Sequence, residues 1–483
     1  MQNFLKRLFF RNKKRAYFIG IAGAGMSGVA QLLKTKGWKV SGSDEGAYPP
    51  ITTYLEKHDI PYAKTYTKDN VPKDADLIVV GKHAGLTKEE NEEVAFVHEH
   101  NYHTQSFPDV LHDLTKQTHN IICAGSYGKS TCASILSWCL TEKDPSFFIG
   151  ALPRNFDTNA QSGTGNLFIL EGDEYPASNT DPRSKFLFYN AKDVLITSLE
   201  HDHVNVFKTQ HDYNKPFLEL IASMPNNGML VLCGDDPEIK NVLPTLRRDV
   251  YTYSANEHTA CDWYVKNIVY GEETTFDLCR KDIAIIPITT SLLGKHNIEN
   301  IAGVAALILE QELITPKVFQ EKIRTFTGVE RRLDKKTNRS AIPLYEGFGS
   351  SAGKVRSAIA AMKTHFKDKR LLVLFEPYSF SWRRKDYAHS YKDLFAGADT
   401  VYVYTDGLSE SDDAEVLSGN DIISLIKKEG GSGSERLRKD LDPLLQEISD
   451  GDVLLSLSSG SFDGLLPKIV EGLEKRPDQI EQT

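Results

Sequence analysis

Short apolar runs recur along the chain, and most of them are separated by segments long enough for a helix. The runs are Ala16–Ile21, Leu77–Val80, Ile121–Ala124, Leu167–Leu170, Val194–Thr197, Met229–Leu232, Leu371–Phe375, Thr400–Tyr404 and Val453–Leu457. Short buried strands that alternate with helices are typical of α/β domains with parallel sheets. Residues 262–290 alternate as antiparallel strands do, so we also expect a small mixed-sheet addition in the middle of the chain.

The length of the chain predicts more than one domain. Single hydrophobic cores stop growing at roughly 250–300 residues, and this chain has 483. The strand pattern has three phases, which predict domains at residues 1–117, 118–325 and 326–483. The GGSGS stretch at 430–434 is expected to be a flexible loop inside the third domain.

Composition and charge restrict the class of protein. Hydrophobic residues make up 40% and charged residues 25%, as in ordinary globular proteins, and the formal net charge of -9 provides no general attraction to nucleic acid. The six cysteines contain no C-x-x-C pair and are expected to be reduced. No apolar stretch approaches the ~18 residues of a spanning helix. We therefore expect a cytoplasmic protein without stable membrane insertion or nucleic-acid binding.

The first fifteen residues are basic and contain a short apolar group. They lack the longer apolar region and the cleavage site of a signal peptide. We expect a frayed arm before the first strand, with weak attachment to a membrane surface as the alternative.

A glycine-rich turn follows the first strand. Residues 20–28 read Gly-Ile-Ala-Gly-Ala-Gly-Met-Ser-Gly and lead into a helical pattern. Glycines at such a turn let backbone amides approach a diphosphate, and the helix dipole favours its charge. Asp44 follows the second strand, where a carboxylate can bind a ribose hydroxyl. The pattern fits a nicotinamide or flavin dinucleotide, a nucleotide sugar, or a turn without a ligand.

A second phosphate-binding turn lies between the strand that ends at Ala124 and the next helix. Residues 125–131 read Gly-Ser-Tyr-Gly-Lys-Ser-Thr. The backbone amides and Lys129 can hold the β- and γ-phosphates of a nucleotide, and the hydroxyl of Ser130 suits Mg²⁺. It is not a standard Walker A motif, because Cys123 stands where that motif requires glycine. Two such turns suggest an enzyme that brings a nucleotide-linked substrate to ATP.

Acidic residues and histidines follow two further strands. Glu171, Asp173 and Glu174 come after Leu167–Leu170, and residues 200–203 read Glu-His-Asp-His after Val194–Thr197. In open α/β sheets ligands bind at the carboxyl ends of the strands. One or two carboxylates together with substrate oxygens are enough for Mg²⁺. We predict a magnesium site here, with a zinc site or solvated surface charges as the alternatives.

These motifs together resemble the Mur ligases over almost the whole chain. The residues that carry the resemblance are the two turns, Glu-Gly-Asp-Glu-Tyr at 171–175, residues 200–203, Gly-Asp-Asp-Pro at 234–237, Gly-Lys-His-Asn-Ile-Glu-Asn at 294–300 and Gly-Val-Glu-Arg-Arg-Leu at 328–333. The resemblance implies a three-domain α/β architecture, with a Rossmann-like N-terminal domain, a P-loop ATPase-like central domain and a Rossmann-like C-terminal domain. It implies an ATP- and Mg²⁺-dependent ligase that activates the carboxylate of UDP-N-acetylmuramate as an acyl phosphate and joins it to an amine.

The resemblance also implies roles for individual residues. The UDP-sugar-binding residues would be Gly23, Ala24, Gly25, Met26, Ser27 and Asp44. The ATP-binding residues would be Gly125, Ser126, Tyr127, Gly128, Lys129, Ser130, Thr131, His296, Asn297, Asn300 and Arg331. Lys129, Glu171 and His203 would be catalytic, with Ser130, Glu171 and His203 as metal ligands.

Three segments bear on the amine substrate. Residues 181–186, 375–384 and 458–464 look most like the murein peptide ligases, which attach a preformed L-Ala-γ-D-Glu-meso-diaminopimelate tripeptide. The members that add L-alanine are the closest alternative. By this resemblance the amine substrate would meet Glu376, Tyr378, Ser379, Arg383 and Arg384. A monomer or a homodimer is expected.

One segment departs from the family pattern. Residues 346–353 read Glu-Gly-Phe-Gly-Ser-Ser-Ala-Gly where members usually have D-D-[FY]-[AG]-H-H-P-T. The loss favours either a diverged ligase with compensating groups or a paralogue that binds nucleotide with little catalysis. Lys215 lies near the position of a carbamylated lysine in several members, and an exposed helix lysine is the alternative.

Overall fold

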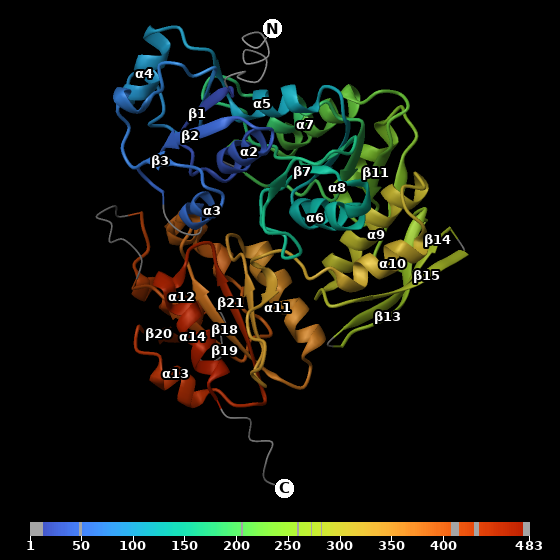
Figure 1. Cartoon of the computed structure of the whole chain (residues 1–483). Coiled ribbons are helices and arrows are strands. Elements are labelled where there is room, and N and C mark those ends of the chain that lie inside the picture. Colours follow the sequence, from blue (N-terminus) through green and yellow to red (C-terminus); the bar gives the residue numbers. More distant parts are fainter. Residues whose placement is uncertain are drawn as a thin grey trace. The chain divides into compact units, whose positions relative to one another are not determined.

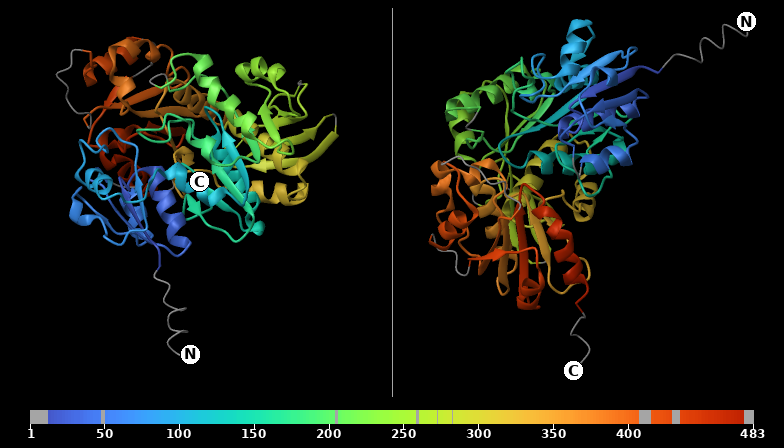
Figure 2. Two further views of the ribbon diagram at one scale, coloured as in Figure 1. Left: turned by 90° about the horizontal axis from the view of Figure 1, so that it is seen from above. Right: turned by 90° about the vertical axis from the view of Figure 1, so that its left-hand side faces the viewer.

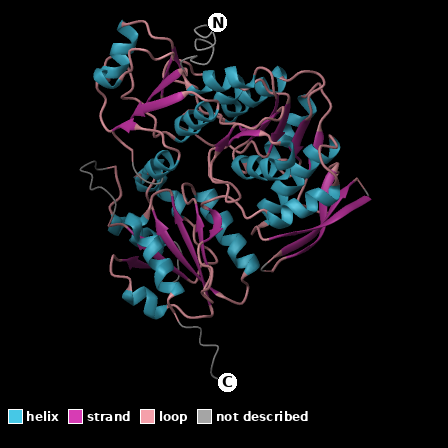
Figure 3. Ribbon diagram, viewed as in Figure 1, coloured by secondary structure: helices cyan, strands magenta, loops and turns pink. Residues whose placement is uncertain are grey.

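The computed structural model describes residues 13–47, 51–203, 206–257, 260–271, 273–281, 283–406, 415–428 and 434–476. Residues 1–12, which hold most of the expected basic arm, and residues 430–433 of the expected loop lie outside these ranges. The helices and strands are labelled in Figure 1, and Figure 3 separates the two classes by colour. No helix in the described part is long and apolar enough to cross a membrane.

The described strands form three sheets. The first contains β1 (Arg15–Ile19), β2 (Lys39–Ser43), β3 (Tyr62–Ala63), β4 (Leu77–Val80) and β5 (Thr104–Gln105). The second contains β6 (His119–Ala124), β7 (Ser146–Phe148), β8 (Ala160–Gln161), β9 (Leu167–Glu171), β10 (Asp193–Ile196), β11 (Leu230–Cys233), β12 (Tyr251–Tyr253), β13 (Trp263–Val269), β14 (Thr274–Arg280) and β15 (Ile283–Thr290). The third contains β16 (Arg332–Lys335), β17 (Leu344–Gly347), β18 (Arg370–Glu376), β19 (Thr400–Tyr404), β20 (Ser434–Leu437) and β21 (Asp452–Ser458).

Helices connect most of these strands. They are α2 (Ala24–Thr35), α3 (Ile51–Lys57), α4 (Glu92–Glu99), α5 (Phe107–Thr115), α6 (Lys129–Cys139), α7 (Gln210–Ser223), α8 (Pro237–Val242), α9 (Lys295–Glu310), α10 (Pro316–Thr325), α11 (Ala352–His365), α12 (Gly419–Lys428), α13 (Asp442–Glu447) and α14 (Leu465–Glu474). The predicted alternation of strands and helices is confirmed, with strand ends that differ from the predictions by a few residues.

The first sheet has the order β3-β2-β1-β4-β5, and its neighbouring strands are parallel. The order reverses between β1 and β4. Ligands bind at such a reversal in open α/β sheets, at the carboxyl ends of the strands. The glycine turn leaves β1 at this point, so the sheet topology agrees with its predicted role.

The second sheet places the phosphate-binding turn between two other strand ends. Its order is β15-β14-β13-β12-β11-β10-β6-β9-β7-β8, and β6 pairs in parallel with both β9 and β10. At the far end of this sheet, only a few residues separate β13, β14 and β15. Such short connections require antiparallel neighbours, which agrees with the mixed-sheet addition expected at 262–290.

Alternate residues of the third sheet enter two different cores. Leu371, Val373 and Phe375 of β18 pack with residues of α11 and α12. Leu372 and Leu374 of the same strand pack with residues of α13 and α14. A parallel sheet covered on both faces needs apolar residues at successive positions, which explains the continuous apolar runs in the sequence. Figure 2 gives two further views of the chain.

The chain divides into two compact units. One contains the described parts of Met1–Lys266, together with Asp277–Pro287 and Glu299–Phe326. The other contains Asn267–Phe276, Ile288–Ile298 and the described parts of Thr327–Thr483. The first two sheets therefore lie mainly in one unit and the third sheet in the other. The domain limits at 117 and 325 stay a proposal.

Helix α2 packs closely against aromatic side chains beyond the first sheet. A Cβ at Gly25 would lie 2.8 Å from the Phe107 ring, and a Cβ at Gly28 would lie 2.8 Å from the Phe148 ring. Phe148 ends β7 of the second sheet. These two glycines therefore permit close packing between the regions of the first and second sheets, in addition to forming the turn.

Gly28→Val is expected to lower the free energy of unfolding by about 1–3 kcal/mol, because the added side chain would overlap the Phe148 ring. Urea denaturation measures the change. Gly85→Ala is the matched control, since a Cβ there meets His83 at an ordinary 3.4 Å. That control should stay within about 0.5 kcal/mol of the unaltered protein. Equal stability of all three proteins would contradict the close packing at Gly28.

Candidate active site

The carboxyl ends of β6, β9 and β10 bring three polar segments together. Cys123 of β6 lies opposite Glu171 of β9, and Ala124 lies opposite Ile196 of β10. The turn 125–128 is therefore bordered by the acidic segment that starts at Glu171 on one side and by residues 197–203 on the other. The sequence predicted this grouping, because it placed each motif after a parallel strand.

Two glycines shape the turn. The φ angle is 131° at Gly125 and 79° at Gly128, both in the region that favours glycine. A Cβ at Gly125 would lie 2.8 Å from the Ser198 nitrogen, and a Cβ at Gly128 would collide with the Asn300 side chain. Both positions therefore require glycine for conformation and for space.

Residues after β10 hold the turn in place. The Ser126 N–H donates to the Ser198 carbonyl at 3.1 Å, and the Tyr127 N–H donates to the Ser198 hydroxyl at 3.0 Å. The Thr197 hydroxyl donates to the Tyr127 carbonyl. The first N–H groups of α6, which begins at Lys129, have no partner within the helix and are suited to an anion. Thr131 lies in the same first turn and is buried.

A buried carboxylate links Lys129 to His203. The Glu174 side chain is 1% exposed, and its Oε2 lies 3.1 Å from the Lys129 ammonium. Its Oε1 lies 3.0 Å from His203 Nε2. The Tyr213 hydroxyl of α7 reaches the same carboxylate at 3.4 Å and the Ser126 hydroxyl at 2.9 Å. The buried network therefore joins the turn, the acidic segment, the segment after β10 and α7.

Burial and neighbouring charges shift the pKa values of Lys129 and Glu174 in opposite directions. Burial raises the pKa of Glu174, but the Lys129 charge and the His203 hydrogen bond outweigh it, so the pKa lies below the usual value. Burial lowers the pKa of Lys129, and the carboxylates of Glu174 and Glu171 more than offset it, so that pKa is raised. Both groups are therefore charged at neutral pH. Lys129 also donates to the Gly125 carbonyl at 2.6 Å.

Ser130 and Glu171 form a second polar pair beside the first. The Ser130 hydroxyl donates to Glu171 Oε1 at 2.9 Å, and the Gly150 N–H donates to Glu171 Oε2 at 2.6 Å. The structure thus brings together the residues predicted to hold the metal, Ser130, Glu171 and His203, around Lys129 and Glu174.

This donor set fits Mg²⁺ better than zinc. The described residues contain no cluster of three or more His, Cys, Asp or Glu side chains that could hold a metal ion by themselves. His201 of the His-Asp-His triplet is engaged with the Phe207 carbonyl at 2.9 Å. Structural zinc sites need four such ligands and catalytic zinc sites three. Mg²⁺ is commonly held by one or two carboxylates, with phosphate oxygens and water as the other ligands.

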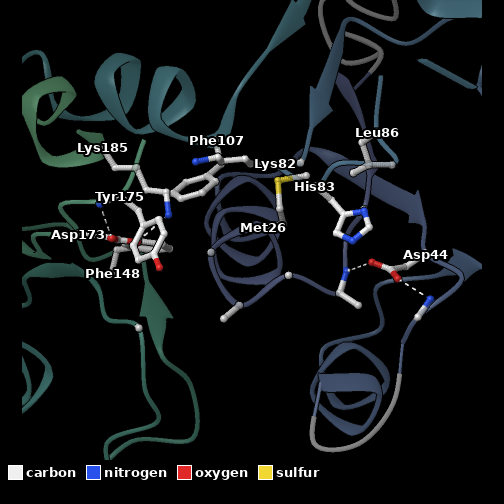
Figure 4. Close-up of a pocket in the computed structure, with 18 of the residues that line it drawn as sticks. Met26, Asp44, Lys82, His83, Leu86, Phe107, Phe148, Asp173, Tyr175 and Lys185 are labelled. Carbon is white, nitrogen blue, oxygen red and sulfur yellow. Dashed lines mark hydrogen bonds and ion pairs between the residues drawn. The ribbon is translucent and has the colours of Figure 1, made fainter. Parts of the chain in front are cut away.

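A cavity of about 860 Å³ runs from the glycine turn to this edge of the second sheet. The predicted residues Gly23, Ala24, Gly25, Met26 and Asp44 line one part of it, and Glu171, Asp173 and Tyr175 line another. In Figure 4, Tyr175 and Lys185 lie on one side of the view, and His83 and Asp44 on the other.

Two predicted residues of this region make different contacts from those expected. Asp44 accepts N–H groups from Ala22 and Gly46, each at 2.9 Å, so its carboxylate shapes the turn as well as lining the cavity (Figure 4). Ser27 does not line the cavity. It is buried, and its hydroxyl donates to the Ala24 carbonyl at 3.1 Å.

Two lysines that the sequence did not single out for this role also line the cavity. Lys185 is bonded to Asp173 at 2.6 Å, and its ammonium lies 5.7 Å from the centre of the Tyr175 ring. Lys82, from the loop after β4, lies 5.7 Å from the centre of the same ring. Partial burial and the Lys185 charge lower the pKa of Lys82. Lys82 therefore adds positive charge to this part of the cavity, beside the Lys185–Asp173 pair.

The first turns of α9 carry three predicted ATP-binding residues with different surroundings. Asn300 is buried beside the turn, and its side-chain oxygen accepts from the Cys132 thiol at 3.4 Å. Asn297 is buried and donates to the Leu293 carbonyl at 2.8 Å. His296 is exposed, and its Nδ1 lies 3.5 Å from the Ser357 hydroxyl of α11.

Arg331 is engaged within the third sheet's unit. It donates to the carbonyls of Ser458 at 2.8 Å and Gly460 at 2.6 Å, and it pairs with Glu346 at 3.2 Å. These contacts fix the loop after β21. The expected contact of Arg331 with a γ-phosphate stays a prediction.

The predicted amine-binding residues lie at or after the end of β18, but they do not form one exposed group. Glu376 is 1% exposed and accepts from the Ser458 hydroxyl and from the Phe462 N–H. The carboxylate therefore supports the loop after β21, and its expected contact with the amine stays a prediction. Tyr378 is 47% exposed.

The remaining members of this group also have partners. Ser379 donates to the Ser350 carbonyl at 3.4 Å. Arg384 pairs with Asp386 at 3.0 Å, while Arg383 lies half-buried beside it. Lys215 is exposed on α7 and does not line the cavity, which favours the exposed-lysine interpretation.

Comparison with known proteins identifies the family. The Mur ligase middle domain matches residues 123–308, and the catalytic domain of the Mur ligase family matches residues 15–119.

The chain belongs to the Mur ligase family. Mur ligases are ATP-dependent amide ligases with three α/β domains, so the predicted fold class and enzyme class are confirmed.

Full-length relatives include more than one kind of Mur ligase. A UDP-N-acetylmuramate–L-alanine ligase of Ruthia magnifica subsp. Calyptogena magnifica is 28% identical over 479 residues, which cover 97% of this chain and 98% of the relative. The UDP-N-acetylmuramate–L-alanyl-γ-D-glutamyl-meso-2,6-diaminoheptandioate ligase of Escherichia coli is 26% identical, over 96% of this chain and 99% of the relative. The crystal structure of the alanine ligase of Thermotoga maritima shares the fold, with a TM-score of 0.76, 21% identity and coverage of 95% and 98%.

The segment that departs from the Mur ligase pattern is held by neighbours in its own unit. Glu346 pairs with Arg331 and, at 3.0 Å, with Lys336. The Gly349 carbonyl accepts the Trp382 indole N–H at 2.8 Å. Gly349 also allows close packing within this segment, because a Cβ there would lie 2.9 Å from the Leu457 carbonyl carbon.

Glu174→Gln is expected to lower the free energy of unfolding by about 3–5 kcal/mol, because it leaves the buried Lys129 ammonium without its closest carboxylate. Urea denaturation at neutral pH tests this. Glu142→Gln is the matched control, since Glu142 pairs with Lys322 at 3.2 Å but is 80% exposed. The control should change stability by no more than about 1 kcal/mol. A similar small change in both variants would refute the buried pair.

Proposed function

We propose that this Mur ligase joins L-alanine to the carboxylate of UDP-N-acetylmuramate at the expense of ATP. One observation carries the proposal. A single cavity is lined both by the glycine turn of the first sheet and by Glu171 and Asp173, next to the Lys129 turn. A nucleotide sugar bound by the glycine turn would extend toward the phosphate-binding turn.

The polar groups of the cavity match the parts of a nucleotide sugar. The N-terminus of α2 and the turn at Gly23–Gly25 suit the diphosphate. Lys82 and Lys185 supply positive charge between this turn and the second sheet. Phe107 and Tyr175 offer apolar surface for the sugar ring.

ATP would bind at the turn before α6. Gly125 to Thr131 would surround its phosphates, Lys129 would hold the γ-phosphate, and Asn300 would support the turn. Mg²⁺ would be held by Ser130, Glu171 and His203, and when bound it supplies positive charge to the phosphate oxygens. Glu174, which contacts both Lys129 and His203, joins the residues that the sequence singled out.

The reaction would need positioning and charge compensation more than proton transfer. The muramate carboxylate attacks the γ-phosphorus of ATP, which breaks the bond to ADP and leaves an acyl phosphate. The uncharged amine then attacks the acyl carbon, loses a proton and expels inorganic phosphate. Lys129 would offset the charge on the transferring phosphoryl group.

The amine is assigned to L-alanine for two reasons. Relatives that match almost the whole chain bear that activity in their names. In addition, a tripeptide brings further carboxylates, which need cationic partners, and Arg384 is already paired with Asp386.

The tripeptide is the second candidate. It is supported by the segments at 181–186, 375–384 and 458–464 and by the similarity to the Escherichia coli tripeptide ligase. We place the protein in the cytoplasm, where ATP and nucleotide sugars are available, as a monomer or a homodimer. The contacts expected of His296 and Asn297 with the adenine or acyl-phosphate region belong to the same proposal.

Incubation of the pure protein with ATP, Mg²⁺, UDP-N-acetylmuramate and one amine decides between the candidates. Phosphate release and product mass are measured with L-alanine and with the tripeptide in parallel. We expect efficient turnover with L-alanine only. Turnover with the tripeptide only would transfer the assignment to the second candidate. Nucleotide binding without amine-dependent phosphate release would indicate a paralogue with little catalysis.

Lys129→Ala is expected to reduce ligation at least about 100-fold, because the transferring phosphoryl group loses its nearest fixed cation. Binding of UDP-N-acetylmuramate, measured by calorimetry without ATP, should change less than about threefold, which also shows that the variant is folded. Lys88→Ala, at a surface lysine paired with Glu89, is the control. Full ligase activity of Lys129→Ala would remove the ATP site from this turn.

A further inference from the structure

His365, the last residue of α11, contacts two distant segments of the chain. Its Nε2 lies 2.9 Å from the Gly294 nitrogen, just before α9. Its Nδ1 lies 2.8 Å from the Gly271 carbonyl, in the connection between β13 and β14. All three residues lie in the same compact unit.

These two bonds require a neutral imidazole with its proton on one particular nitrogen. The backbone N–H of Gly294 is a donor, so Nε2 must accept. The backbone carbonyl of Gly271 is an acceptor, so Nδ1 must carry the proton. A protonated His365 would place an N–H against the Gly294 N–H and lose that bond.

Helix α11 packs tightly against the segment that His365 holds. A Cβ at Gly294 would lie 2.8 Å from the Ala361 Cβ, and the φ of 90° at Gly294 also favours glycine. The Ser357 hydroxyl lies 3.5 Å from His296. The start of α9 is therefore docked on α11 at Ser357, Ala361 and His365, which lie on one face of the helix at i, i+4 and i+8.

The same helix α9 leads to the phosphate-binding turn. It begins at Lys295, carries His296 and Asn297 in its first turn, and continues without interruption to Asn300 and beyond. The Asn300 side chain lies against Gly128 and the Cys132 thiol. A displacement of the start of α9 would therefore also move Asn300, which lies against the turn.

We propose that His365 is a positioning residue for ATP, acting through Gly294 on the first turns of α9. This inference rests on the proposed ATP site. It assigns to α11 a role in nucleotide binding although α11 begins within the segment, 346–353, that departs from the Mur ligase pattern. His365 does not touch the nucleotide in this proposal.

The surroundings of His365 determine its response to pH. The Tyr270 ring packs edge-on at 5.2 Å, and burial raises the pKa of Tyr270, so this neighbour stays neutral in the acidic range. His296 lies near the same end of α11, where desolvation and the charges of Arg332 and His365 lower its pKa to about 4, so it too is neutral above that pH. On α11 itself Lys363 pairs with Asp399 at 3.3 Å. Burial lowers the pKa of His365. The bond to Gly294 is thus complete at neutral pH and is lost only as pH falls through this lowered pKa, below the ordinary histidine value of about 6.5.

The test compares two substitutions with different chemistry. Glutamine can accept from Gly294 and donate to Gly271, and it does not titrate. Leucine can do neither. Binding of a non-hydrolysable ATP analogue with Mg²⁺, and separately of UDP-N-acetylmuramate, is measured by calorimetry from pH 5.5 to 8. His389→Gln is the control, since His389 is an exposed histidine bonded to the Asp386 carbonyl.

At pH 8 we expect His365→Leu to weaken binding of the ATP analogue about 10-fold, as one unsatisfied backbone donor implies. His365→Gln should bind within about threefold of the unaltered protein, and UDP-N-acetylmuramate binding should be unchanged in both. The unaltered protein and His389→Gln should lose more affinity for the ATP analogue as pH falls than His365→Gln does, because the terminal phosphate of the analogue titrates alike in all three proteins.

Other outcomes separate this inference from the proposed function. Unchanged ATP affinity in His365→Leu, or an equal loss of both ligands, would overturn the positioning role. An acid-dependent loss of the same size in His365→Gln as in the unaltered protein would assign the pH response to another group and overturn this one. If the unaltered protein binds ATP as expected but never ligates, the proposed function fails while the effect of His365 still stands. Absence of ATP binding would overturn both.

Discussion

The parallel pairing of β6 with β9 and β10 is the constraint on which the candidate site depends. It places the carboxyl ends of three strands at one edge, with the phosphate-binding turn in the middle. Residues after β10 then accept hydrogen bonds from the N–H groups of the turn, and a residue after β9 provides the carboxylate that pairs with Lys129. A change in strand order would separate Lys129 from Glu174 even if every local motif were kept.

The charges at this edge depend on one another because they are removed from water. Glu174 is almost fully buried, and it stays ionised because Lys129 and His203 contact it. Such a pair contributes little net stability compared with apolar packing, yet removal of one partner is costly. In the proposed function the pair serves to hold the Lys129 ammonium next to the turn that would bind ATP.

Glycines serve close packing as much as ligand binding in this chain. Gly25 and Gly28 admit aromatic rings beside α2, and Gly294 admits α11 beside the start of α9. In each case a segment expected to bind a ligand is pressed against a neighbouring element. The cavity and the start of α9 are thus defined by how elements pack, in addition to the motifs they carry.

The sequence by itself determined the α/β class, the strand positions, the two phosphate-binding turns and their order, because each depends on local periodicity or on a few adjacent residues. It also placed the segments after these strands at a common edge, since parallel strands end there, and the resemblance to the Mur ligases singled out Ser130, Glu171 and His203 within them. Only the tertiary structure decided how individual side chains are used. In the folded chain Glu376 is bonded at the end of the third sheet, and Arg384 is paired with Asp386. Glu174, Tyr213, Lys82 and Lys185 lie at the site.

Adjacency to Glu171 and Asp173 was the one local signal for Glu174. The contacts of Tyr213, Lys82 and His365 join residues far apart in the chain, and such contacts follow from packing, on which the local pattern of one sequence carries no information.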